Sequence, residues 1–142
     1  MSASKFFFAM VAALTISLAY GVVRAQDKTV WDGVYSDAQA KRGETLFADK
    51  CAKCHAGDLS GGEGPSLAGS EFSGNWDDLS INDLAERIRV SMPQDNPQSL
   101  TRDQVADLIG LILRANKIPA GQSDLSAQAD ALKAIKYKAN KP

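Results

Sequence analysis

Histidine and cysteine are nearly absent from this 142-residue chain, which contains one histidine and two cysteines. A structural zinc site needs four Cys or His ligands in nearly every case, and the chain can offer only three. The formal net charge is −1 and no stripe of basic residues is present, so nothing indicates nucleic-acid binding. The composition therefore argues against a zinc-binding module and a nucleic-acid-binding domain.

The N-terminal segment is the longest hydrophobic run. It has Lys5 near its start, an apolar stretch from Phe6 to about Val23, and small residues at Val23 and Ala25. This pattern predicts a secretory signal peptide, residues 1–25, that is cleaved after Ala25 and leaves one domain over residues 26–142. The stretch is close to the length of a transmembrane helix, so an uncleaved anchor is the alternative. We expect the protein to contact a membrane only if this segment is retained.

Four segments repeat apolar residues at steps of three and four, the spacing of an amphipathic helix. They cover residues 36–51, 80–92, 101–116 and, over a shorter stretch, 126–135. The first three open with side-chain N-caps, which are Ser36 or Asp37, Ser80, and Thr101. The pattern predicts an all-α domain.

Two segments lack this repeat. Residues 56–79 are rich in Gly, Ser, Asp and Pro, which predicts a long loop that wraps around something. The stretch VWDGVY at 30–35 places Asp-Gly between apolar pairs, a hairpin signal, but an isolated two-stranded hairpin is marginal. We therefore expect a loop here, with Trp31 and Tyr35 packed onto the domain.

Every thiol and imidazole of the chain lies in the five residues CAKCH. Cys54 and His55 follow Cys51 by three and four positions, so on a helical turn all three side chains leave the same face. Exported cysteine pairs usually form disulfides, but the adjacent histidine argues against one. A thioredoxin-type motif would belong to a βαβ pattern, which the sequence lacks. The motif therefore predicts one covalent haem c, with two thioether bonds and an imidazole that reaches the iron.

These features resemble the class I monohaem cytochromes c. The stretches that carry the resemblance are GETLF with Gly43 and Phe47, CAKCH, GPSL, the Met92-Pro93 pair and a closing amphipathic helix, which together cover most of residues 26–142. The resemblance implies an all-α fold wrapped around one haem, with a C-terminal extension from about residue 117. It also implies that Gly43 lets the first and closing helices cross closely. Unlike many family members, this closing helix has no aromatic residue at the crossing.

Three further residues are candidates for the haem site. The resemblance implies that the carbonyl of Pro65 accepts a hydrogen bond from the second ring nitrogen of His55. Trp76 either donates to a haem propionate, as in the family, or is an ordinary core tryptophan. Met92 is the only methionine after residue 25 and lies between a helix end and two prolines, so it is the expected sixth iron ligand; a lysine or an open position is the alternative. The candidate cofactor-binding residues are Cys51, Cys54, His55, Pro65, Trp76 and Met92, with His55 and Met92 on the iron.

The predicted function is one-electron transfer rather than catalysis. The resemblance implies a periplasmic shuttle between a dehydrogenase or quinol-oxidising complex and an oxidase or reductase. The alternative is a dedicated electron-accepting subunit of an exported quinoprotein-type dehydrogenase, because VWDGVYSDAQAKRGETLF and MPQDNPQSL are similar to cytochromes that accompany such enzymes. A gas-binding or peroxidatic haem protein would need an open distal position. The C-terminal lysines, Lys133, Lys136, Lys138 and Lys141, form a solvated face or, alternatively, dock an acidic partner.

Overall fold

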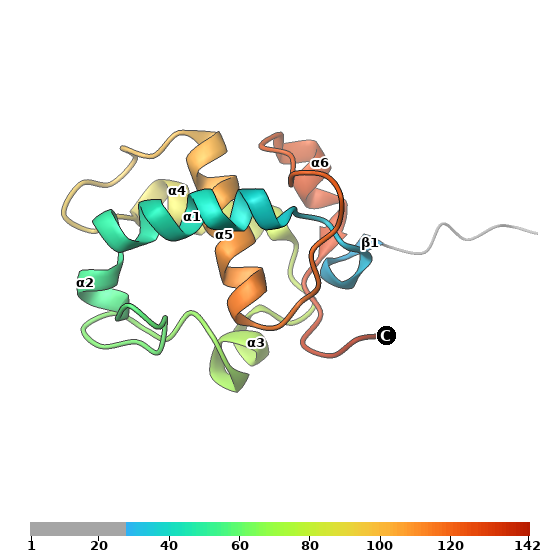
Figure 1. Ribbon diagram of the computed structural model, residues 1–142, viewed down its shortest axis with the longest axis horizontal. Coiled ribbons are helices and arrows are strands. Elements are labelled where there is room, and N and C mark those ends of the chain that lie inside the picture. The colour runs from blue at the N-terminus through green and yellow to red at the C-terminus, as the bar shows by residue number, and fades with distance from the viewer. Residues whose placement is uncertain (1–27) are drawn as a thin grey trace, which may run out of the picture.

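The computed structural model describes residues 28–142, and the expected signal peptide lies outside the described residues. Helices dominate, as the sequence predicted (Figure 1). The elements are β1 (Lys28–Thr29), a 3₁₀ helix η1 (Val30–Asp32), α1 (Asp37–Lys50), α2 (Ala52–His55), α3 (Ser70–Trp76), α4 (Ile81–Ser91), α5 (Arg102–Ala115), α6 (Ala129–Lys133) and β2 (Ile135–Lys136).

The three longest helices begin where the capping residues predicted. The side chain of Ser36 accepts a hydrogen bond from the backbone of Gln39 at the start of α1. α4 and α5 open with reciprocal capping boxes, in which Ser80 pairs with Asp83 and Thr101 with Gln104. Each box satisfies backbone N–H groups that the first helical turn leaves without partners.

The α1–α5 crossing forms the centre of the molecule (Figure 1). A Cβ atom on Gly43 would lie 2.1 Å from the carbonyl oxygen of Asp107, so the two backbones approach as closely as only glycine permits. The close crossing expected from the sequence is confirmed. α5 supplies Gly110 instead of an aromatic residue there, and a Cβ atom on Gly110 would lie 3.5 Å from the ring of Tyr35. The buried Tyr35, which precedes α1, therefore contributes an aromatic ring beside the crossing.

The expectation of a continuous loop over residues 56–79 is wrong, because α3 lies within it. α3 has only seven residues and follows Gly69, whose φ is 89°. Among the described residues, no side chain caps its N-terminus. Its apolar pair, Phe72 and Trp76, is four residues apart and shares one face, but the segment is too short to show a sustained repeat.

The C-terminal segment, residues 117–142, packs against the start of the domain. β2 pairs in parallel with β1, with Lys28 opposite Ile135. The buried side chain of Gln39 exchanges two hydrogen bonds with the backbone of Leu125, at 3.1 and 2.6 Å. These contacts join residues about a hundred positions apart, so the extension belongs to the same folded unit. α6 is shorter than the helix expected over residues 126–135.

The segment VWDGVY forms no hairpin, in agreement with the expectation from the sequence. It contains η1 and a turn at Gly33 in the left-handed region. Trp31 is half-buried and its indole N–H donates to the carbonyl of Lys138 at 2.9 Å, while Tyr35 is buried. Within residues 28–142, no helix is both long and apolar enough to cross a membrane.

Candidate functional site

The cysteine-histidine motif forms a single helical turn directly after α1. The backbone N–H of Cys51 donates to the carbonyl of Phe47 at 2.8 Å, which ends α1, and His55 N–H donates to the carbonyl of Cys51 at 3.0 Å, which closes α2. α2 therefore begins at the close of a helix whose position is fixed by the crossing with α5. The junction of α1 and α2 therefore positions all three side chains of the motif.

The two thiols of the motif are partly buried. Cys51 and Cys54, both within the part of the chain that the structure describes, form no disulfide and are half-buried. Burial raises the pKa of the Cys51 thiol, whereas a nucleophilic or zinc-binding cysteine requires a lowered one. The Sγ atom of Cys54 lies 3.8 Å from a carboxylate oxygen of the exposed Glu63. Desolvation of this kind disfavours the thiolate form of Cys51.

The His55 ring has one nitrogen engaged and is nearly enclosed. Its side chain is 7% exposed, and Nδ1 lies 2.7 Å from the carbonyl oxygen of Pro65. Because a carbonyl can only accept, Nδ1 carries the proton and donates it, which leaves the lone pair on Nε2. A hydrogen bond of this kind fixes the ring orientation and makes Nε2 a stronger metal ligand. This is the contact that the family resemblance implied for Pro65.

Gly64 lies against the same ring, and no specific signal in the sequence selects it. A Cβ atom at this position would lie 2.7 Å from Cε1 and 2.9 Å from Nδ1 of His55. The loop is folded back over α2 by hydrogen bonds from Gly61 N–H to the carbonyl of His55 at 3.0 Å and from Gly64 N–H to that of Cys54 at 2.9 Å. The only signal in the sequence is a glycine before Pro65, and several neighbouring glycines obscure it.

Met92 and Trp76 lie on other elements. Met92 terminates α4 with extended backbone angles, its N–H donates to the carbonyl of Ile88 at 2.9 Å, and it is half-buried. Trp76 is the last residue of α3, is also half-buried, and makes a tilted ring contact with Phe72, with centroids 6.1 Å apart and an interplanar angle of 36°. Among the described residues, neither side chain forms a hydrogen bond or ring contact with α2, so the structure joins His55 and Pro65 directly but not these two.

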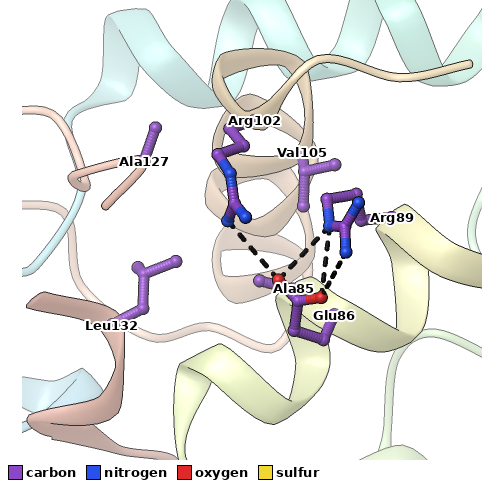
Figure 2. A pocket seen from close by; sticks show the side chains of 7 residues that line it. All are labelled: Ala85, Glu86, Arg89, Arg102, Val105, Ala127 and Leu132. Atoms are coloured by element: carbon purple, nitrogen blue, oxygen red, sulfur yellow. Dashed lines mark hydrogen bonds and ion pairs between the residues drawn. The ribbon is translucent and has the colours of Figure 1, made fainter. Parts of the chain in front are cut away.

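Two surface hollows do not contain the motif. The first lies between α4, α5 and the C-terminal segment, where Arg89 and Arg102 both bind the carboxylate of Glu86, and its free volume of about 10 Å³ admits no more than a water molecule (Figure 2). The second, about 760 Å³, lies at the chain ends and is lined by Lys28, Trp31 and several C-terminal residues. Neither hollow is lined by a cysteine or by the histidine.

Comparison with known proteins identifies the family. The family described as "Cytochrome C oxidase, cbb3-type, subunit III" matches residues 38–112, slightly more than half of the chain. The chain belongs to the cytochrome c family. Cytochrome c-551 from Bacillus subtilis (strain 168) is 34% identical over 83 residues, which cover 58% of this chain and 72% of that protein.

A solved structure gives a weaker similarity. The sulfane dehydrogenase SoxCD from Paracoccus pantotrophus aligns with a TM-score of 0.49 and 20% identity, over 84% of this chain and 64% of that chain. The present cytochrome c thus spans less than two thirds of the SoxCD chain.

The family identity and the site agree on the cofactor. This cytochrome c carries one covalently bound haem c with its iron, and Cys51, Cys54 and His55 fit the Cys-x-x-Cys-His attachment motif. The helical fold agrees with a class I monohaem cytochrome c. The residues present also suit a haem. The hydrogen bond at Nδ1 of His55 leaves the lone pair on Nε2 to bind iron, and Gly64 leaves room for the imidazole ring in this orientation. A cytochrome c domain transfers electrons, as the sequence predicted.

Proposed function

We propose that this cytochrome c is an exported one-electron carrier, not itself an enzyme, in which His55 and Met92 are the axial ligands of the haem iron. The observation that carries the proposal is the 2.7 Å contact between His55 Nδ1 and the carbonyl of Pro65. When bound, the haem supplies an iron that alternates between Fe(III) and Fe(II). The chain holds the imidazole in one orientation and presents Nε2, so that little rearrangement accompanies a change of charge.

Met92 supplies the proposed second ligand. It is the only methionine among residues 28–142, and no second histidine exists in the chain. The α4 helix fixes its backbone through the bond to Ile88. A thioether is a soft donor that favours Fe(II), so His/Met ligation raises the reduction potential of the haem. The alternatives to Met92 are a lysine ligand or an open distal position, as in a gas-binding protein, and substitution of Met92 distinguishes them from methionine ligation.

Half-exposed apolar side chains supply the proposed surroundings of the cofactor. They occur on α1, α3 and α4, at the junction of α1 with α2, and in the loop after α2, and they are Leu46, Cys51, Leu67, Trp76 and Ile88. A large apolar group packed on such surface would complete their burial and exclude water from the iron. Within residues 28–142 the indole N–H of Trp76 makes no hydrogen bond, which supports its proposed role as donor to a haem propionate.

The proposed location is the periplasm, after cleavage behind Ala25. The proposed partners are a dehydrogenase or quinol-oxidising complex as donor and an oxidase or reductase as acceptor. The name of the matching family, which mentions an oxidase subunit, supports an oxidase among them. Mass spectrometry of the native protein should show a chain that starts at Gln26 and carries one haem. Co-elution with a much larger dehydrogenase in gel filtration would instead favour the dedicated-subunit alternative.

Substitution of Met92 tests the ligand set. The wild-type ferric protein should show the weak long-wavelength sulfur-to-iron absorption band, and Met92→Ala should lose it. We expect the reduction potential to fall by well over about 60 mV, the equivalent of roughly 1.4 kcal/mol for one electron. The ferrous variant should bind carbon monoxide readily. Val90→Ala, at an exposed position of the same helix end, is the control and should change none of these properties. An unchanged band and potential in Met92→Ala would remove Met92 from the iron.

A further inference from the structure

The C-terminal segment reaches α3 through Tyr137, the residue after β2. Tyr137 is 1% exposed. Its N–H donates to the carbonyl of Leu79 at 2.8 Å, and its own carbonyl accepts from the N–H of Asp78 at 3.0 Å. Two main-chain hydrogen bonds therefore fix Tyr137 to the linker that follows α3.

The side chain of Tyr137 packs on α3 itself. Its ring meets Phe72 edge to face, with centroids 5.8 Å apart and an interplanar angle of 81°, and its hydroxyl lies 2.9 Å from Oγ of Ser73. Burial raises the pKa of the Tyr137 phenol above its ordinary value, which further disfavours loss of the hydroxyl proton. Phe72 in turn makes a tilted ring contact with Trp76. A continuous line of aromatic contacts thus leads from the C-terminal segment to the last residue of α3.

α3 depends on such contacts for its position. A helix of seven residues is marginal in isolation, and a Cβ atom on Gly74 would meet nothing within 4 Å, so one face of α3 is unsupported. The N-terminal side is held by the N–H of Gly69, which donates to Oδ1 of Asn116 at 3.0 Å. Tyr137 holds the middle of α3, at Phe72 and Ser73, and its backbone holds Asp78 and Leu79 just after the helix.

We infer that Tyr137 is a positioning residue for the haem site, because it holds α3 through Phe72 and Ser73 and thereby fixes the orientation of the Trp76 indole. The inference rests on the proposed function in one respect, that Trp76 donates to a haem propionate. A donor at this group offsets negative charge near the iron and so favours Fe(II). Loosening of α3 would weaken that donor and shift the equilibrium toward Fe(III).

A pair of tyrosine variants of the haem-loaded protein tests this role. Tyr137→Phe removes the hydroxyl that contacts Ser73. Tyr35→Phe is the matched control, because Tyr35 is also 1% exposed and its hydroxyl donates to the carbonyl of Ile118 at 2.6 Å, away from α3. We expect Tyr137→Phe to speed amide hydrogen exchange in α3 by about tenfold and to lower the equilibrium constant for reduction by a redox dye about threefold. Tyr35→Phe should leave both quantities near their wild-type values.

Ser73→Ala removes the same hydrogen bond from the other side. It also removes the hydrogen bond from the Ser73 hydroxyl to Oδ1 of Asn116 at 3.4 Å, so Ser73→Ala should loosen α3 at least as much as Tyr137→Phe. The double variant should change both quantities by less than the sum of the two single changes, because the two substitutions share the Ser73–Tyr137 contact. The inference is overturned if α3 loosens while the reduction equilibrium stays unchanged, or if Tyr35→Phe shifts that equilibrium equally. If the proposed ligation by His55 and Met92 is wrong, the wild-type protein will lack the sulfur-to-iron band. The comparison of Tyr137→Phe with Tyr35→Phe does not depend on that band and still tests the role of Tyr137.

Discussion

Replacement of Gly43 by alanine should destabilise the domain far more than the same change at Gly110, the other glycine of the α1–α5 crossing. The new Cβ atom would lie 2.1 Å from the carbonyl oxygen of Asp107, well inside contact distance, and 3.1 Å from Cβ of Leu111. Because the first neighbour is backbone, no rotamer change relieves the clash and the helices must separate. Forcing additional volume into a packed core costs about 1–3 kcal/mol or more, and removal of a helical glycine returns about 1 kcal/mol.

We therefore expect a net loss of about 2 kcal/mol for Gly43→Ala, a fall in Tm of roughly 8 °C for a domain of this size, as measured by circular dichroism of the haem-loaded protein. At Gly110 the nearest atoms would be 3.4–3.5 Å away, an ordinary contact distance, so the gain in helix propensity remains and Gly110→Ala should be neutral or slightly stabilising. Equal Tm values for the two variants would refute the close approach of α1 and α5.

Two further predictions concern the haem site and the pH dependence. Gly64→Ala should push against the His55 ring and weaken its hydrogen bond to Pro65, so that the imidazole becomes a less basic ligand and the reduction potential rises. Gly57→Ala, with open space around its Cβ atom, should leave the potential unchanged. Equal potentials for the two variants in a redox titration would contradict this prediction. The hydrogen bond from Arg89 holds the pKa of Glu86 below its usual value, so its stabilisation is present above about pH 4 and is lost as the pH falls through the folded-state pKa. Urea unfolding of Glu86→Gln at several pH values should therefore show a shallower acid-side loss than the wild type, and parallel pH profiles would exclude this contribution.

The parts of the fold that could be predicted from the sequence depend on neighbouring residues. The starts of α1, α4 and α5 follow from side chains that cap backbone groups within three residues, namely Ser36, Ser80 and Thr101. The haem motif likewise lies in five consecutive residues. Gly43 could be selected because it shares the helix face of Phe47 and Cys51. All of these signals are local and are present in the sequence before any tertiary contact forms.

The parts that could not be predicted depend on residues far apart in the chain. β1 and β2 have two residues each, too few for an alternating pattern, and they pair across more than one hundred positions. α3 has no capping residue and is positioned by Tyr137 and Asn116, which lie far downstream. The requirement for glycine at position 64 depends on where the His55 ring lies in three dimensions. Tertiary packing decides each of these features.

The parallel pairing of β1 with β2 brings the two ends of the described chain to one end of the molecule, and α2 lies at the opposite end (Figure 1). An attachment made through the exposed Pro142 would therefore leave the haem-bearing turn directed away from the support. When the protein is attached to an electrode through its C-terminus, it should exchange electrons readily with a soluble partner but slowly with the electrode itself. A tether near α2, for example at Lys53, should reverse that preference.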